Sequence, residues 1–403
     1  MSNIKKGITV RKNVDVVLTL YKRPEVLLKQ LNALQIQTIK PRNIYLYQDG
    51  IDSYYEIKLK QDIREQFTGI KISNINQGVW ERFKYAKEIV KEEYVCLFDD
   101  DTIPGKKWIE NCLKCMGEKE GIYGTNGILL NLNTNYPYGN DVRVGWNAPN
   151  WYVAEVDFVG HAWFLKTEWL SFMFDGTESI RKYKHVGEDM CLSAKCLEHG
   201  IHTYVPEHLY TNTQLWGSIP KYGKAFGISS TAISSDSSNY IFMNNVLKVL
   251  RNEGWKCVAE RDTNAYRKSL NSIKIEIDKI HNIIISELDT FLQNANHIYI
   301  YGAGKIAKIF FDYINKKKYT VEAFIVSNIQ NEKSLFYCKQ PILDIQNYNF
   351  SFENELVILG IDSFYHKEIR GHFQNIKNIQ IYPPKDAVIS YDELLKIIVQ
   401  KIK

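Results

Sequence analysis

The stretch EYVCLFDDDTIP, residues 93–104, runs from an apolar segment directly into three consecutive aspartates. The apolar part has the composition of a buried β-strand. Two carboxylates about 4 Å apart repel by roughly 1 kcal/mol in water, and by more in a less polar setting. The aspartates therefore form either a solvated turn, with one of them capping a helix before Pro104, or the ligands of a divalent cation such as Mg²⁺ or Mn²⁺.

The segments around this stretch predict an α/β layer with a mostly parallel sheet. Four β-rich runs alternate with two helical patterns, of which one begins at Pro24 and the other covers 78–92. The expected strands are 14–21, 43–50, 69–76 and 93–98. Ligands of such sheets bind at the carboxyl ends of the strands. Because Asp49, Asn76 and Asp99–Asp101 all fall at such ends, the pattern favours the cation interpretation over the turn.

The middle of the chain, 120–235, is rich in tryptophan, tyrosine, glycine and asparagine. Aromatic side chains beside amides and hydroxyls suit the faces of sugar rings, although each tryptophan could equally be a core residue. The tryptophans concerned are Trp146, Trp151, Trp163 and Trp169.

Two acids and a histidine follow this aromatic segment. Glu188 and Asp189 stand at the start of a helical pattern, where they either complement the helix dipole or supply a general base at the edge of a site. His208 lies in the segment 204–218, and its imidazole could complete a metal site made of carboxylates.

The chain changes character after about residue 236. Apolar residues at three- and four-residue steps predict one long amphipathic helix over 269–293, which could link domains or pair with a partner helix. A second α/β unit opens at 297 with a strand, the turn Gly302-Ala303-Gly304 and a helix. Ser327 and Asn328 stand where a dinucleotide-binding unit would carry an acid, which argues against a nicotinamide cofactor. We expect three parts: 1–240, a helical linker 241–296, and 297–403.

The composition fits a soluble protein of 403 residues with more than one domain. The net charge of +5 is too small to indicate nucleic acid as a partner, but it suits an anionic ligand or an anionic membrane surface. No apolar run reaches the roughly 18 residues of a membrane span, and the first residues do not form a signal peptide, so a cytoplasmic protein is expected. The seven cysteines are expected as reduced thiols, with Cys112 and Cys115 as packing residues.

Several of these motifs, taken in order, resemble inverting glycosyltransferases of the GT-A fold, of the family-2-like kind. The resemblance covers roughly residues 12–235. In LYKRPEVL (20–27), Tyr21, Arg23 and Pro24 match the family's T-Y-N-R-P-x-x-L, whereas Leu20 and Lys22 replace its Thr and Asn. FDDDTIP (98–104) looks like the D-x-D motif.

Four further motifs carry the same resemblance. YQDG presents Asp49 where the family has an aspartate that binds the nucleotide base. NINQG (74–78), which contains Asn76, is followed by Arg82 and is similar to an N-x-G element with a diphosphate-binding arginine. VGHAWF (159–164) resembles the loop that shapes the sugar site, and GED (187–189) resembles the family's E-D motif. The C-terminal part, 297–385, resembles small Rossmann-like domains attached to bacterial sugar-modifying enzymes.

The resemblance implies a fold, an activity and a set of site residues. The implied fold is a GT-A mixed, mostly parallel sheet with a smaller Rossmann-like α/β domain joined by a long helix. Asp189 would be the catalytic base, with Glu188 as the fallback. Asp101, helped by Asp99 or Asp100, would hold Mn²⁺ or Mg²⁺, and His208 would complete the metal site. The residues expected to bind the donor are Leu20, Tyr21, Arg23, Asp49, Asn76, Arg82, Asp99, Asp100, Gly160, His161 and Trp163. Which of the three aspartates bind metal and which bind ribose stays open.

The implied donor is a nucleotide-diphosphate sugar, with UDP as the expected nucleotide. The implied acceptor is a glycan or a lipid-linked glycan of bacterial capsule or O-antigen synthesis, and a lipid-linked acceptor would bring the protein to the inner membrane face. Three alternatives remain. A sugar-phosphate nucleotidyltransferase would need a G-x-G-x-R stretch that the first strand lacks. A scaffolding or sugar-nucleotide-binding protein would use the 269–293 helix, and an oxidoreductase would use Gly302–Gly304.

Overall fold

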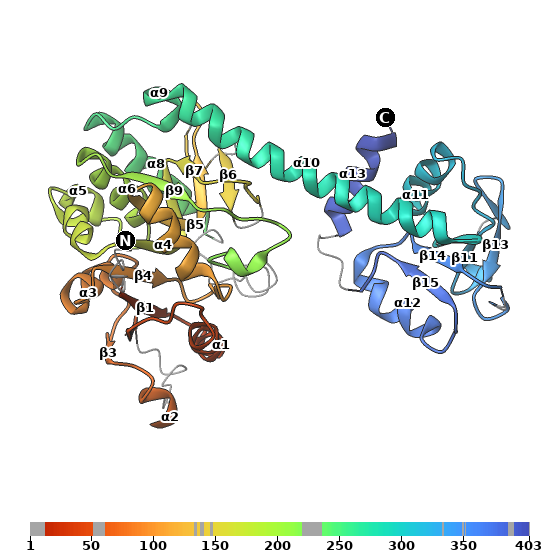
Figure 1. The fold of residues 1–403 in the computed structure, drawn as a ribbon, viewed down its shortest axis with the longest axis horizontal. Coiled ribbons are helices and arrows are strands. Elements are labelled where there is room, and N and C mark those ends of the chain that lie inside the picture. The colour runs from red at the N-terminus through yellow and green to blue at the C-terminus, as the bar shows by residue number, and fades with distance from the viewer. Residues whose placement is uncertain are drawn as a thin grey trace, which may run out of the picture. The chain divides into compact units, whose positions relative to one another are not determined.

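The computed structural model describes residues 13–50, 61–132, 135–137, 141–145, 148–219, 236–332, 334–348, 350, 352–385 and 391–402. The chain forms two compact units, Met1–Ile277 and Asp278–Lys403 (Figure 1). Trp146 lies outside the described residues. Within the described ranges, no helix has an apolar stretch long enough to cross a membrane.

The first unit is built on a mixed nine-stranded sheet with the order β3-β2-β1-β4-β8-β5-β9-β7, and β6 pairs with β5. The strands are β1 Val14–Leu20, β2 Asn43–Gln48, β3 Gly69–Ile72, β4 Tyr94–Phe98, β5 Gly121–Leu129, β6 Val142–Gly145, β7 Ala154–Val156, β8 Phe158–Lys166 and β9 His202–Val205. The first four strands pair in parallel, as expected from the sequence. β8 runs antiparallel between β4 and β5, which the sequence did not predict.

Helices accompany this sheet. They are α1 Pro24–Gln35, α2 Gln61–Arg64, α3 Glu81–Ile89, α4 Trp108–Glu118, α5 Glu178–Arg181, α6 Glu188–Glu198, α8 Ser237–Asn252 and α9 Val258–Arg261. Short 3₁₀ helices lie at Thr167–Phe174 and Thr213–Leu215. The central strand β1 is buried at every position, which explains its continuous apolar run. α1 begins at Pro24, whose ring suits the first turn of a helix, and buries Val26, Leu27 and Leu31.

The second unit is the smaller α/β domain that the sequence predicted. Its sheet has the order β12-β13-β11-β10-β14-β15, and all pairs except β12 with β13 are parallel. The strands are β10 His297–Tyr301, β11 Ala323–Val326, β12 Phe336–Tyr337, β13 Gln340–Asp344, β14 Glu355–Leu359 and β15 Ile379–Tyr382. The helices are α11 Lys305–Lys316, α12 His366–Phe373 and α13 Tyr391–Ile402, with 3₁₀ turns at Ile329–Asn331 and Ser363–Tyr365.

The helix predicted over 269–293 is confirmed as part of α10, Thr263–Asn294, which begins in the first unit and ends in the second. The turn after β10 packs closely against the segment that follows β14. Gly302 has φ +100°, and a Cβ there would lie 2.5 Å from Ile361 Cγ2, so the position requires glycine. All seven cysteines are free thiols, and six of them are buried.

Candidate active site

The three aspartates form a tight turn at the carboxyl end of β4. We call Asp99–Thr102 the aspartate turn, because Thr102 N donates to Asp99 O at 3.2 Å and closes a four-residue β-turn. Asp101 is buried, whereas Asp99 and Asp100 are half-buried. The structure therefore contains the turn that one interpretation of the sequence expected. Its aspartate side chains, however, are buried or half-buried and not fully solvated.

The antiparallel strand β8 brings a histidine to this turn. Phe98 lies opposite Ala162 in the pairing of β4 with β8, and Asp99 N donates to His161 O at 2.9 Å. His161 has φ +68°, a left-handed conformation that is uncommon for a residue with a side chain. The neighbouring Gly160 is open on its side-chain side: apart from its chain neighbours, no described atom lies within 4 Å of the place where a Cβ would stand.

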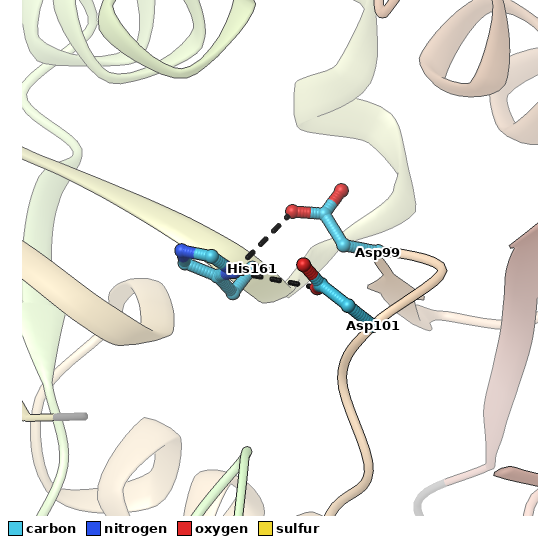
Figure 2. Close-up of side chains that lie close together, drawn as sticks. All are labelled: Asp99, Asp101 and His161. Atoms are coloured by element: carbon cyan, nitrogen blue, oxygen red, sulfur yellow. Dashed lines mark ion pairs between the residues drawn. The ribbon is translucent and has the colours of Figure 1, made fainter. Parts of the chain in front are cut away.

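Asp99, Asp101 and His161 form the one group of three potential metal ligands found among the described residues (Figure 2). His161 Nδ1 lies 3.7 Å from Asp99 Oδ2 and 3.6 Å from Asp101 Oδ1. These distances exceed those of a hydrogen bond. Donor atoms that bind one divalent ion at about 2.0–2.2 Å lie roughly 3.0–3.6 Å apart, so small movements would bring the three atoms onto a common cation.

Arg82, on α3, connects the aspartate turn to the start of α6. Its Nη1 lies 2.6 Å from Asp99 Oδ1, and its Nη2 donates to Glu188 Oε1 at 2.8 Å. The guanidinium carbon lies 4.8 Å from the ring centre of Trp163, which is fully buried on β8. Arg23 acts similarly on the other side of the turn, where its Nη1 lies 2.6 Å from Asp100 Oδ1. Both arginines thus pair with carboxylates of the turn.

The two acids at the start of α6 have different surroundings. Glu188 is buried and paired with Arg82. Asp189 is half-buried, and its Oδ1 accepts a hydrogen bond from Met190 N at 2.7 Å. Burial raises the pKa of Asp189 to about 6, while burial and the neighbouring Asp189 raise the pKa of Glu188 to about 8. Of the two, Asp189 is the carboxylate that is accessible and largely ionised near neutral pH.

The crowding of carboxyl groups also changes the acidity of the turn. Burial, and then Asp101, raise the pKa of Asp100 to about 8, and burial raises the pKa of Asp99. Burial opposes ionisation of Asp101, but His161 and Arg23 outweigh it and hold the pKa of Asp101 below its usual value. Burial opposes protonation of His161, but Asp101 and Asp99 outweigh it and raise the pKa of His161. A cation bound here would remove much of this carboxylate repulsion.

A second cluster lies at the carboxyl ends of β1 to β3. Asp49 is buried, and its two oxygens accept hydrogen bonds from Gln77 N at 2.8 Å and Gly78 N at 3.1 Å. Asn76 Nδ2 donates to Tyr21 Oη at 3.0 Å, and Asp49 N donates to Leu20 O at 3.0 Å. The structure therefore brings Leu20, Tyr21, Asp49 and Asn76 together. Tyr21 is half-buried and Asn76 is exposed, whereas Asp49 is buried and holds the loop that carries Asn76.

The structure does not bring His208 to the aspartates. Its ring is buried beside Trp108 and Trp216, and its Nδ1 donates to Pro206 O at 2.9 Å. Thr125 Oγ1 lies 3.1 Å from Nε2, so both ring nitrogens are engaged in a neutral imidazole. Burial lowers the pKa of His208 to about 4. The histidine that the sequence suggested as a metal ligand is thus a core residue, and His161, predicted to bind the donor, stands in the ligand group instead.

One buried residue beside the turn has no counterpart among the predicted site residues. Gln30 of α1 donates hydrogen bonds to the backbone of the aspartate turn. Its only signal in the sequence is a polar residue on the otherwise apolar face of α1.

Comparisons with known proteins add little to this geometry. No protein-family model matches the chain, and no curated protein sequence matches it. The crystal structure of S. aureus TarS is similar over part of the chain, with 15% identity and a TM-score of 0.35. That match covers 48% of this chain and 35% of the TarS chain, so the chain spans about a third of the TarS chain. At this score the likeness carries no conclusion about fold or activity.

Proposed function

We propose that this chain is a metal-dependent inverting glycosyltransferase that moves a sugar from a nucleotide-diphosphate donor, UDP-linked, to a hydroxyl group of a glycan. One observation carries the proposal: Arg82 joins a cation-ligand group, which includes Asp99, to a helix start that presents the accessible carboxylate Asp189. These groups lie at the carboxyl edge of an α/β sheet, where such sheets bind their ligands.

The donor set of the cation site fits a divalent ion. Asp99, Asp101 and His161 would hold it, and Asp100 Oδ2 is a buried oxygen with no hydrogen-bond partner among the described residues. Carboxylates suit both Mg²⁺ and Mn²⁺, but an imidazole ligand favours Mn²⁺ over Mg²⁺. When bound, the ion would supply neutralisation of the negative charge that develops on the leaving diphosphate.

The protein's own residues would perform the remaining tasks. Tyr21 and Asn76 would contact the nucleoside: the amide of Asn76 donates to the hydroxyl of Tyr21, and together they present an aromatic ring and an amide. Asp189 would accept the proton of the acceptor hydroxyl as that oxygen attacks the anomeric carbon. Its raised pKa makes it a stronger base than an ordinary aspartate, while it is still largely ionised at pH 7. A single base and a direct displacement give inversion at the anomeric carbon.

A nucleotide-release assay tests the proposal. The purified full chain is incubated with UDP-, GDP- and dTDP-sugars, with Mn²⁺ or with a chelator, and freed nucleotide is detected. We expect release from one donor that requires the metal and is lost in Asp101→Asn. If no donor is hydrolysed or transferred, and no nucleotide binds in the presence of Mn²⁺, the chain is not a transferase of this kind and a scaffolding role becomes the better explanation.

A further inference from the structure

A buried glutamine ties together the two ends of the aspartate turn. The side chain of Gln30 is 1% exposed, and its Nε2 donates to Asp99 O at 2.7 Å and to Thr102 O at 2.9 Å. These are the first and the last carbonyl groups of the turn, which Thr102 N already closes by its bond to Asp99 O. One amide group therefore bridges the turn from the side of α1.

The bonding of this amide indicates what the side chain is for. Both partners are carbonyl oxygens, so the NH₂ group must face them, and its two hydrogens match the two acceptors. The other end, Oε1, is buried and has no hydrogen-bond partner among the described residues. A buried polar atom without a partner destabilises a protein. The glutamine is therefore poorly satisfied as a packing residue, yet both donor hydrogens of its amide are used on the aspartate turn.

Fixing the two carbonyls limits how the intervening peptide groups can rotate. The side chains of Asp99 and Asp101 leave the same short turn, so the separation of their carboxylates depends on that backbone. On the opposite side, Asp99 N is held by His161 O at 2.9 Å, which places the third ligand residue against the same segment. Gln30 and His161 thus hold the turn from two sides.

We propose that Gln30 is a positioning residue that sets the affinity of the aspartate turn for its divalent cation. The inference rests on the proposed metal site. The Nε2 group of Gln30 contacts backbone carbonyls of the turn, not the side chains of the ligand group. Groups that orient metal ligands from behind typically change metal affinity 10- to 100-fold when they are replaced.

The chain offers a matched control seven residues further on. Gln37 is 3% exposed, its Nε2 donates to Gly105 O at 2.8 Å, and its Oε1 accepts from Ile109 N at 3.2 Å. Like Gln30, it joins the α1 region to the segment that follows β4. It differs in that Gly105 and Ile109 lie beyond the turn, and in that its Nε2 also donates to Ala33 O of α1 at 3.1 Å. Methionine has a similar volume to glutamine and lacks the amide. Gln30→Met therefore removes two hydrogen bonds at the turn, and Gln37→Met removes three that do not involve it.

Binding of Mn²⁺ alone to the full chain tests the inference, measured by the electron paramagnetic resonance signal of free Mn²⁺ well below the unfolding temperature. We expect Gln30→Met to weaken binding at least 10-fold and Gln37→Met to change it less than about 2-fold, although both variants lose thermal stability. Gln30→Asn, which keeps the amide but cannot reach both carbonyls, serves if the methionine variant does not fold, and it should also weaken binding.

The outcomes separate this inference from the proposed function. If the wild-type chain binds Mn²⁺, Asp101→Asn does not, and the Gln30 variants bind as the wild type does, then the metal site stands and the positioning role is wrong. The role is equally wrong if Gln37→Met loses as much affinity as Gln30→Met. If the wild-type chain does not bind Mn²⁺, or if Asp101→Asn binds it unchanged, the metal site itself fails and the inference fails with it.

Discussion

Asp189→Asn should slow transfer strongly, and the pH dependence of the wild-type enzyme should show why. Burial raises the pKa of Asp189 from the usual 3.8 to about 6. A base with that pKa is about 90% ionised at pH 7 and about 10% ionised at pH 5, so kcat/KM should fall about tenfold between its plateau and pH 5. An aspartate of ordinary pKa would still be more than about 90% ionised at pH 5 and would give almost no decrease. The negative charge of Asp99 contributes to the raised pKa of Asp189, and a cation bound to Asp99 would cancel part of that contribution. The midpoint of the decrease in kcat/KM is therefore expected at pH 6 or slightly below.

The assay is nucleotide release with the donor identified in the panel, at saturating Mn²⁺, from pH 4.5 to 8. Asp189→Asn should lower kcat by the roughly 10²- to 10⁴-fold that a general base contributes, and the acidic limb should vanish from any residual rate. Glu188→Gln is the matched control. Its carboxylate is paired with Arg82, so the variant should lose activity through the weakened site yet keep the acidic limb.

Two results would refute this assignment. Full activity in Asp189→Asn would show that another group takes the proton. Loss of the acidic limb in Glu188→Gln, with the limb kept in Asp189→Asn, would move the base to Glu188. Protein fluorescence recorded at each pH excludes unfolding as the cause of the decrease.

The two histidines allow contrasting predictions. Because burial lowers the pKa of His208 from 6.5 to about 4, the unfolded chain takes up a proton at this residue between these values and the folded chain does not. Its stabilising contribution is therefore complete above pH 6.5 and falls by up to about 3 kcal/mol on acidification to pH 4. Urea unfolding can be followed by tryptophan fluorescence, which reports on the first unit because all eight tryptophans lie there. The free energy of unfolding should fall with decreasing pH in the wild type and fall less in His208→Gln. An equal pH dependence in both proteins would contradict the prediction. His161→Ala should weaken Mn²⁺ binding at least tenfold and Mg²⁺ binding less, measured by paramagnetic resonance and by Mg²⁺ competition, and an unchanged preference would remove His161 from the ligand set.

Much of the fold could be predicted because its signals are local. The apolar runs before Asp49, Asn76 and Asp99 each read as a strand without knowledge of any other segment, and the rule that parallel strands present their carboxyl ends at one edge places these residues on a common side. The same holds for the long helix α10 and for the strand–glycine–helix unit after it.

The site depended on pairings that local patterns do not contain. β8 was not expected as an antiparallel neighbour of β4, so nothing in the sequence indicated that His161 stands beside Asp99. His161 was predicted as a donor-binding residue only because VGHAWF resembles a loop of a known family, and not because any contact with Asp99 was expected. For His208 the error is the reverse, because a core residue was interpreted as a metal ligand. Its segment YVPEHLY gives no sign that Trp108 and Trp216 enclose the ring. These tryptophans lie 100 residues before it and 8 residues after it in the sequence. Arg82 could be identified as a site residue, but its two carboxylate partners follow only from the tertiary structure, which brings Asp99 after β4 and Glu188 of α6 to the same guanidinium.

The charges of the site themselves argue for a cation. Five carboxyl groups gather around two arginines; the carboxyl groups are Asp99, Asp100, Asp101, Glu188 and Asp189, and the arginines are Arg23 and Arg82. The two arginines cannot neutralise five carboxylates. Burial first, and then the neighbouring carboxylates Asp101 and Asp189, raise the pKa values of Asp100 and Glu188 to about 8, so both groups retain protons near pH 7. A core that only needed to be stable would gain from apolar residues at these positions. Carboxyl groups held close together by Arg82, by the β4–β8 pairing and by the amide of Gln30 are better explained by a doubly charged ion, which neutralises them and displaces those protons.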